Sequence, residues 1–194
     1  MGSVPPGHAP PGQPSGAAAR IGPTAVFDAK VDAAFDHLRG RALPDRAFYA
    51  ASALGDHSLI WLILGVVRAL RGGADWRVAR GVFGVMGLES TLINILVKSV
   101  VRRRRPVWAG IHPHPLRQPL SSSFPSGHAT SAFCGAGLLA QGSPVWPAYY
   151  VTAAVIAASR VHVRIHHASD VVGGVAIGIL LGRLARRVVP LPIP

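Results

Sequence analysis

The sequence predicts an all-α protein, an integral membrane helical bundle of about five spans preceded by an N-terminal interfacial amphipathic helix. Three observations support this fold class. Of the 194 residues, 49% are hydrophobic and only 14% are charged, whereas charged residues make up about 25% of an average soluble domain. The apolar residues are concentrated in runs that approach the length of a membrane helix. The basic residues, which give a formal net charge of +12, separate these runs instead of lining one polar face, so nucleic-acid binding is the weaker interpretation of the charge.

Residues 1–23 are rich in Pro, Gly, Ala and Ser, and we expect a disordered tail there because such a segment has no core to bury. The segment lacks the apolar stretch of a signal peptide. Residues 24–194 are expected to form a single membrane-embedded domain. Within it, apolar residues recur at helical spacing from Thr24 to Arg41, and a second short helix is expected from Pro44 to Leu54. We place both helices in the membrane interface, although an ordinary soluble amphipathic helix has the same pattern.

Four apolar stretches predict the membrane spans. The second contains Glu89, and a carboxylate within a membrane helix is expected to face protein or a cavity because exposure to lipid is costly; we expect it near the cationic cluster that follows. The third stretch, residues 127–158, has no Asp, Glu, Lys or Arg and is too long for one span, so the turn residues 141–144 divide it into a helical hairpin. The expected spans are Leu54–Leu70, Gly81–Val97, the two arms of 127–158, and the glycine-rich Val171–Leu184.

A cationic cluster follows the second span. Lys98, Arg102 and Arg105 are spaced so that they would share one face of a helix, which Pro106 would help to end. Two interpretations remain open for this cluster alone: an anion site, or the positively charged flank that many membrane helices carry.

The third span begins with a pattern typical of an anion site. Ser126 is a good N-cap residue, and the free N–H groups at a helix start attract anions. Gly127 lets a ligand approach the backbone closely, and His128 would be within reach of that ligand. A capped helix with a histidine at the interface is the simpler alternative.

Between the fourth and fifth spans lies the segment Ser159–Asp170, which holds two arginines and three histidines. His166 precedes Asp170 by four residues, so a carboxylate could orient the imidazole and raise its basicity. Arg160 supplies a planar cation suited to bidentate capture of a phosphate. The alternation of spans across the membrane puts this segment, the cationic cluster and the Ser126 helix start on one membrane side. Their convergence predicts a phosphate site there.

These residues resemble the type 2 phosphatidic acid phosphatase (PAP2) superfamily, membrane branch. The family pattern is K-x6-R-P, then P-S-G-H, then S-R-x5-H-x3-D, and all three parts match in order and with full spacing. The first part runs from Lys98 to Pro106, the second from Pro125 to His128, and the third from Ser159 to Asp170. The resemblance does not cover about the first 50 residues.

The resemblance implies a role for each matched residue. His166 would attack phosphorus and become a phosphohistidine, Asp170 would orient it, and His128 would protonate the leaving group and then activate water. The phosphoryl oxygens would be held by Lys98, Arg105, Ser126, Gly127 and Arg160. No metal and no cofactor is implied, since side-chain cations would neutralise the phosphate. The basic residues outside the pattern are expected at most to contact lipid headgroups: Arg102, Arg103, Arg104, His162, Arg164 and His167.

The expected function is therefore that of a membrane lipid phosphate phosphatase acting on a phosphomonoester or diphosphate. Polyprenyl-linked lipids are favoured as substrates, with phosphatidate and phosphatidylglycerol phosphate as alternatives. The expected partners are this substrate and membrane lipids, without nucleic acid, and a homo-oligomer is compatible with the sequence. We expect a multi-pass protein of the plasma membrane. A raw count of basic residues on the two sides of the membrane places the site in the cytoplasm. If the phosphate-binding cations and the N-terminal region are left out of the count, the excess lies on the opposite side. We therefore expect an outward-facing site.

Three other functions are compatible with the sequence. A metal-dependent hydrolase could use His and carboxylate ligands, with candidates His112, His114, His162, His166 and His167. A vanadium haloperoxidase would have the same type of pocket as the phosphatase. A basic membrane protein without enzymatic activity would bind anionic lipid or nucleic acid through the same charges.

Overall fold

The computed structural model describes residues 22–92, 97–108, 112–119 and 121–188. All regular secondary structure in these ranges is helical, without a strand, which confirms the expected all-α class. The disordered tail expected for residues 1–23 lies outside the described residues except at positions 22 and 23.

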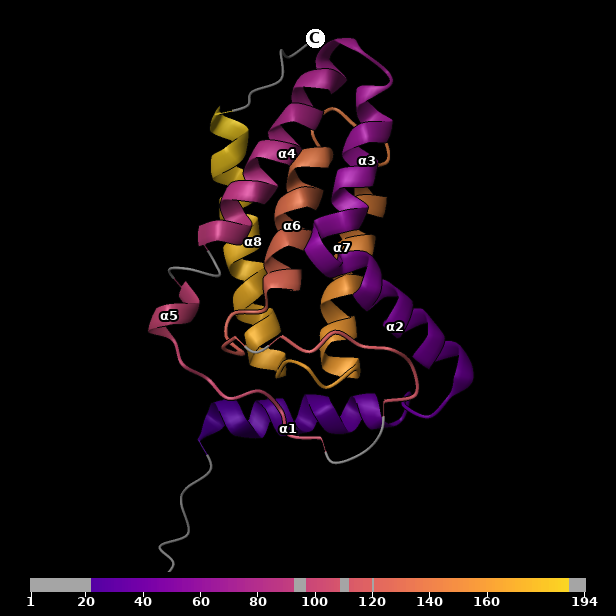
Figure 1. Ribbon diagram of the computed structural model, residues 1–194, viewed down its shortest axis with the longest axis vertical. Helices are drawn as coiled ribbons and strands as arrows, with labels where there is room; N and C mark the ends of the chain where they lie inside the picture. The colour runs from indigo at the N-terminus through magenta and orange to yellow at the C-terminus, as the bar shows by residue number, and fades with distance from the viewer. Residues whose placement is uncertain (1–21, 93–96, 109–111, 120, 189–194) are drawn as a thin grey trace, which may run out of the picture.

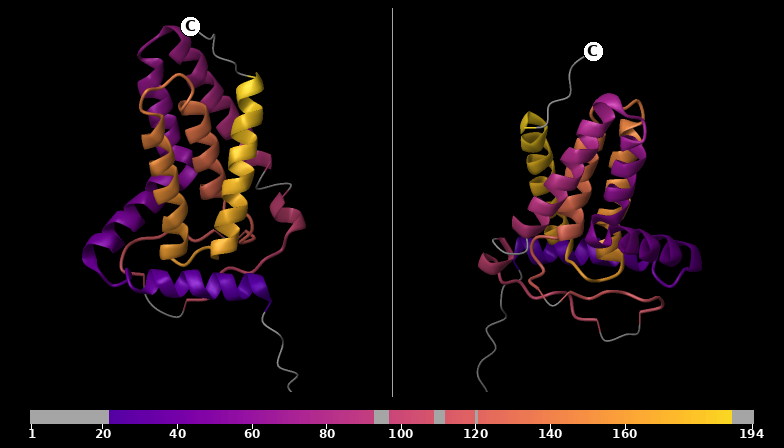
Figure 2. Two further views of the ribbon diagram at one scale, coloured as in Figure 1. Left: turned by 180° about the vertical axis from the view of Figure 1, so that it is seen from behind. Right: turned by 45° about the horizontal axis from the view of Figure 1, so that its top comes forward.

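Five long helices run side by side as a bundle, and a further helix, α1 (Pro23–Asp36), lies across one end of it (Figure 1). The long helices are α3 (Leu59–Ala69), α4 (Gly73–Leu92), α6 (Gly127–Leu139), α7 (Trp146–His162) and α8 (Ala168–Val188). Three further elements complete the order: α2 (Ala42–Gly55) and η1 (Asp56–Ser58) lead into α3, and α5 (Lys98–Val100) follows α4. The end of α4, helix α5, the start of α6, the end of α7 and the start of α8 all lie toward the end of the bundle that α1 crosses (Figures 1 and 2).

Helix α6 forms the centre of the bundle because its residues are small. All of its residues from Ala129 to Leu139 except Phe133 are buried. Helix α8 approaches it closely where glycine leaves room, since a Cβ on Gly178 would lie 2.4 Å from the Thr130 carbonyl oxygen. On the other side, a Cβ on Gly135 would lie 2.8 Å from the Trp61 ring. These close approaches fix α6 between α3 and α8.

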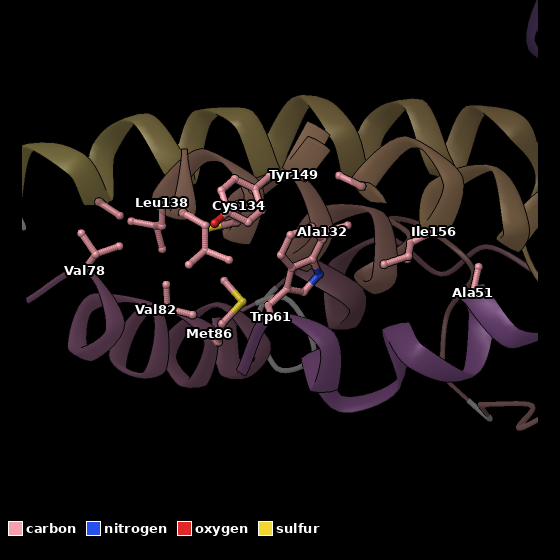
Figure 3. Close-up of a cluster of buried hydrophobic side chains, with 14 residues drawn as sticks. Ala51, Trp61, Val78, Val82, Met86, Ala132, Cys134, Leu138, Tyr149 and Ile156 are labelled. Atoms are coloured by element: carbon pink, nitrogen blue, oxygen red, sulfur yellow. The ribbon is translucent and has the colours of Figure 1, made fainter. Parts of the chain in front are cut away.

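The apolar core fills the space between α6 and its neighbours. Trp61 from α3 is fully buried and lies against side chains from α4, α6 and α7 (Figure 3). The labelled members of this cluster include Val82, Met86, Cys134, Leu138 and Ile156. Cys134 is a free, buried thiol, as expected for a small packing residue.

The structure differs from the sequence predictions in two places near the site. The helix that contains Lys98 ends at Val100, because Val101 is extended with φ −96° and ψ 97°. Lys98, Arg102 and Arg105 therefore do not share one helical face, and that prediction is wrong. The helix before α3 is also interrupted, since His57 and Ser58 have left-handed φ values of 52° and 60°.

At the end of the bundle opposite α1, Arg68 is buried. It pairs with Asp75 at 2.7 Å and donates hydrogen bonds to the carbonyl oxygens of Leu139 and Gln141. These contacts connect the α3–α4 turn with the turn that follows α6. The hairpin division at 141–144 is confirmed, since α6 ends at Leu139 and α7 starts at Trp146.

Within the described part of the chain, two helical stretches are long and apolar enough to cross a membrane, Ala42–Ala69 and Ala168–Arg187. Large apolar side chains are also exposed on several of the long helices. They include Ile63 and Val66 on α3, Phe83 and Leu88 on α4, Val151 and Val155 on α7, and Val172, Leu180 and Leu184 on α8. A soluble monomer rarely exposes so many large apolar groups along its helices, whereas a membrane would cover them.

Candidate active site

A cavity of about 560 Å³ opens at the end of the bundle near α1. Of the eight residues expected to form the site, five line this cavity together: Lys98, Arg105, Gly127, His128 and His166. The other three, Ser126, Arg160 and Asp170, are almost completely buried directly behind the lining. The structure thus brings all eight to one place, although they come from five different segments of the chain.

His166 lies in the turn between α7 and α8 and is 3% exposed. Burial is the largest influence on this imidazole and lowers its pKa to about 3; the Asp170 carboxylate opposes burial, while Arg160 and Arg105 act with it. The ring is therefore neutral at physiological pH. Arg105 Nη1 lies 3.2 Å from His166 Nε2, and since a guanidinium only donates, Nε2 is the acceptor nitrogen and Nδ1 carries the proton. A neutral imidazole with its lone pair on the cavity side can act as a nucleophile.

Asp170 lies behind the His166 ring. Its Oδ2 is 3.8 Å from His166 Nδ1, which is too long for a hydrogen bond but places the negative charge on the proton-bearing side of the ring. The carboxylate is held by the Ser123 hydroxyl at 2.5 Å and by the His167 backbone N–H at 2.8 Å. It is also paired with Arg103 at 2.6 Å. Asp170 is thus fixed and would favour a positive charge on His166.

Lys98 and Arg105 supply the cationic wall of the cavity. Lys98 Nζ donates to the Ser121 hydroxyl at 3.3 Å and would lie 3.8 Å from a Cβ placed on Gly127. Arg105 is held by the carbonyl oxygens of Ser121, Ser122 and Ile165. Burial lowers the pKa of Lys98 to about 8, Arg105 adds to this effect, and Glu89 opposes it. An anion in this cavity would meet two cations that otherwise repel each other.

The start of α6 has the expected cap. The Ser126 side chain accepts a hydrogen bond from the Ala129 N–H at 3.4 Å, and its own N–H donates to the Asp170 carbonyl oxygen. A Cβ on Gly174 would lie 2.6 Å from the Ser126 carbonyl oxygen, so α8 is packed tightly against this helix start. Gly127 then presents its backbone to the cavity.

His128 has a carboxylate partner that the sequence did not reveal. Its Nε2 lies 3.0 Å from Asp56 Oδ1, and its ring lies against Gly55, where a Cβ would be 2.7 Å from the ring carbon Cδ2. Asp56 opens the short η1 element between α2 and α3. The interruption of the helix there therefore orients the second histidine of the site.

Arg160 is 1% exposed and donates from Nη1 to the Ser52 hydroxyl. Its Nε and Nη2 are buried and have no hydrogen-bond partner. Leaving such donors unsatisfied costs about 1–3 kcal/mol each. Unsatisfied guanidinium donors beside a cationic cavity are the arrangement expected if a bound anion completes them.

Arg103, which we had expected to contact lipid headgroups, lies inside the protein framework. It pairs with Asp170 and with Asp28 of α1, both at 2.6 Å, so that expectation is wrong. Asp28 in turn accepts hydrogen bonds from the backbone N–H and the hydroxyl of Ser169. Burial raises the pKa of Asp28, but the bonds from Ser169 and Arg103 outweigh it, and the net pKa lies below the ordinary value.

Two further basic residues had been assigned to lipid headgroups, and that expectation is also wrong. Arg164 pairs with Asp36 and stacks on the Trp108 ring at 4.0 Å, while His162 lies 2.8 Å from Asp45. Because their partners are far away in the sequence, no local pattern indicated these contacts.

Among the described residues, there is no group of three or more His, Cys, Asp or Glu side chains that could hold a metal ion.

Comparison with known proteins relates the whole site region to one family. The PAP2 superfamily matches residues 79–193. The decaprenylphosphoryl-5-phosphoribose phosphatase of Mycobacterium tuberculosis is 34% identical over 151 residues, which cover 74% of this chain and 82% of that protein. The protein of the same name from Mycolicibacterium smegmatis is 37% identical over 125 residues, covering 64% of this chain and 68% of that protein.

The fold is also similar to a solved structure. The crystal structure of a transmembrane PAP2-type phosphatidylglycerolphosphate phosphatase from Bacillus subtilis superposes with a TM-score of 0.67 and 26% sequence identity. The similarity covers 83% of each chain.

Proposed function

This chain belongs to the PAP2 superfamily and is a lipid phosphatase, and from that premise we propose that it removes the terminal phosphate of a polyprenyl-linked lipid through a phosphohistidine on His166. The observation that supports this proposal most directly is the state of His166. Its ring is neutral, its acceptor nitrogen lies beside Arg105 in a cationic cavity, and Asp170 stands behind its protonated nitrogen. The relatives named as decaprenylphosphoryl-5-phosphoribose phosphatases favour a phosphoribosyl polyprenyl lipid as the substrate.

In the first step, the substrate phosphate enters between Lys98, Arg105 and the Gly127 backbone. Arg105 transfers its hydrogen bond from His166 Nε2 to a phosphoryl oxygen, and Arg160 offers its unsatisfied donors from behind. Nε2 forms a bond to phosphorus while the bond from phosphorus to the lipid oxygen breaks. His128, held by Asp56, gives a proton to the departing oxygen, and Asp170 stabilises the positive ring of the phosphohistidine.

In the second step, His128 accepts a proton from a water molecule that attacks phosphorus on the side the alcohol has left. The bond from phosphorus to Nε2 breaks, inorganic phosphate leaves, and His166 returns to its neutral form. Each step needs mainly positioning and charge neutralisation, which the fixed cations supply. In this proposal, Asp56 and Asp170 act alike, since each orients one of the two histidines.

We further propose that residues 24–194 form one membrane-embedded domain with five spans, α3, α4, α6, α7 and α8, and with α1 in the membrane interface. The exposed apolar side chains on α3, α4, α7 and α8 support this, and so does the position of α1 across the bundle end (Figure 2). The arginines that follow α3 and end α8 lie at the other end, which favours a cytoplasmic location for that end. The site then faces outward from the plasma membrane.

The test of this function uses the purified protein in detergent. We expect inorganic phosphate release from a phosphoribosyl polyprenyl phosphate, and a burst-quench experiment with ³²P-labelled lipid should trap label in an acid-labile, alkali-stable form on His166. His166→Ala should lose both activity and label, while His37→Ala, on an exposed histidine, should keep both. Label on another residue, or full activity in His166→Ala, would overturn the proposal.

Inhibitors separate this function from its rivals. Vanadate should inhibit the enzyme as a phosphate analogue, and EDTA should leave its activity intact. Activity that EDTA abolishes and zinc restores would instead indicate a metal-dependent hydrolase, and bromide oxidation in the presence of vanadate would indicate a haloperoxidase.

A further inference from the structure

The catalytic cavity contains a carboxyl group that the proposed reaction does not use. Glu89 of α4 lines the cavity and is 3% exposed. Of the described residues that line the cavity, it alone is acidic. The other charged lining residues are Lys98, Arg105 and Arg117, and the rest are histidine, serine, glutamine, proline or glycine.

Glu89 belongs to the bundle helix α4, whereas Lys98 and Arg105, which would hold the phosphate, belong to the segment that follows this helix. It is close enough to interact electrostatically with Lys98 on one side and with the Cys134 thiol on the other. Cys134 is about two helical turns into α6 from Gly127. The carboxyl group therefore stands between the phosphate-binding end of the cavity and the interior of the bundle, where the part of the substrate next to the phosphate would lie.

The cavity has room for that part of the substrate. Its volume of about 560 Å³ falls within the range of sites that bind a whole small molecule, about 300–1,000 Å³, and a phosphate group fills only a small part of it. Beyond the cations, the lining includes His57, Ser58 and Ser131. His57 and Ser58 are held in left-handed backbone conformations, and strain of this kind tends to be retained where it shapes a site.

A carboxyl group in this place has a definite chemical preference. Burying it within a membrane helix is costly, and its charged form repels a phosphate, which carries the same charge. It can accept hydrogen bonds from hydroxyl groups. A bare prenyl chain next to the phosphate would offer it no hydrogen bond, and a second phosphate would be repelled by its charged form.

We propose that Glu89 is a specificity-determining residue that accepts hydrogen bonds from hydroxyl groups on the leaving alcohol. It selects lipids whose phosphate is attached to a sugar or another polyol, and it disfavours polyprenyl monophosphates and diphosphates. This inference rests on the proposed function and adds the chemistry of the group that the enzyme releases.

The experiment compares kcat/KM for three lipids of equal chain length: a phosphoribosyl polyprenyl phosphate, a polyprenyl phosphate and a polyprenyl diphosphate. The variants are Glu89→Gln, which removes the charge but keeps hydrogen-bonding atoms, and Glu89→Leu, which removes both. Leu88→Ala is the matched control, because Leu88 is the neighbouring residue on α4 and is exposed on the outside of the bundle. Thermal unfolding of each variant in detergent checks that it is folded.

We expect the wild type and Leu88→Ala to prefer the sugar phosphate by at least about tenfold over both other lipids. Glu89→Leu should lose most of that preference. Glu89→Gln should keep part of the preference over the monophosphate and gain activity on the diphosphate.

If Glu89 serves only to balance the charge of Lys98, each substitution changes kcat/KM for all three lipids by the same factor. That result would show that the inference is wrong. It is also wrong if the wild type shows no preference for the sugar phosphate. If the folded wild type releases phosphate from none of the three lipids, the proposed function itself fails.

Discussion

Lys98 is a residue of the cavity wall whose charge depends on pH within the working range. Its ammonium group is partly buried beside Arg105, and these influences lower its pKa to about 8 against the opposition of Glu89. Lys98 is therefore a cation below pH 8 and loses its charge as the pH rises through that value. In the proposed reaction, only the charged form neutralises the incoming phosphate.

We predict an alkaline limb near pH 8 in the profile of kcat/KM, which reports the free enzyme. The limb should lie at higher pH in the profile of kcat, because bound phosphate favours the charged form of Lys98. Lys98→Arg should remove the limb from the accessible range, since arginine does not lose its proton there. A limb that stays near pH 8 in Lys98→Arg would assign the titration to a different group.

The residues of the proposed site could be singled out in the sequence because each belongs to a short pattern with local spacing. Ser126, Gly127 and His128 are consecutive, and His166 and Asp170 lie one helical turn apart. The residues that support them were not predictable in this way. Asp56 contacts His128 across 72 positions, Ser52 contacts Arg160 across 108, and Asp28 contacts Ser169 across 141. A single serine or aspartate gives no signal of such a contact until the fold brings the segments together.

Among the elements, α1 has a closer connection to the site than its amphipathic pattern suggested. The pattern predicted an interfacial helix, and the structure shows that its Asp28 reaches Arg103 and Ser169 beside Asp170. Arg39, just after this helix, donates to the carbonyl oxygens of Val161 and His162 at the end of α7. Helix α1 therefore holds both sides of the turn that carries His166.

The bounds of the elements followed the sequence where glycine and proline mark a turn and departed from it elsewhere. The turn at 141–144 was predicted, whereas the interruption at Asp56, His57 and Ser58 was not, because Gly55 alone precedes it. Helix α4 begins at Gly73, earlier than the expected Gly81, because Arg77 and Arg80 continue the helix instead of flanking it. Charged residues at a span end do not show by themselves whether the helix has stopped.

We predict that Asp28 and Arg103 act on catalysis as one unit. Asp28→Asn and Arg103→Gln should each lower kcat by about 10-fold to 100-fold with little change in KM, as is typical when the partner of an active-site ligand is removed. The loss of transition-state stabilisation is calculated for each variant from kcat/KM. In the double variant, this loss should be smaller than the sum of the losses in the two single variants, by a coupling energy of about 0.5–3 kcal/mol.

The matched control for this prediction is Asp36→Asn on the same helix. Asp36 is about half exposed and pairs with Arg39 and Arg164 away from the cavity. Its substitution should lower the unfolding temperature slightly and leave kcat unchanged. Strictly additive effects of Asp28→Asn and Arg103→Gln would show that the two residues act separately.

For the whole molecule, the arrangement of the helices determines what can reach the site. The cavity is lined by Lys98, Arg105 and the start of α6. Helix α1 lies across one end of the bundle, and the α3–α4 turn lies at the other end (Figure 1). If α3, α4, α6, α7 and α8 all cross the membrane, these two ends lie in different compartments. A substrate must then be presented with its phosphate on the side of α1.

We predict that the two ends react differently with a membrane-impermeant maleimide in intact cells. The chain has a single cysteine, Cys134, which is buried, so Cys134→Ala gives a background without thiols. In that background, Val107→Cys places a thiol on a residue that is 95% exposed beside α1, and Arg71→Cys places one in the exposed α3–α4 turn. With an outward-facing site, Val107→Cys should be labelled in intact cells and Arg71→Cys only after the membrane is made permeable.

The labelling pattern distinguishes three arrangements, provided that each variant retains phosphatase activity. Labelling of Arg71→Cys alone in intact cells would place the site in the cytoplasm and overturn the proposed orientation, while leaving the number of spans intact. Labelling of both thiols in intact cells would mean that the bundle does not separate its two ends across the membrane. The five-span proposal would then be wrong, and the exposed apolar side chains of α3, α4, α7 and α8 would need a different partner from the lipid bilayer.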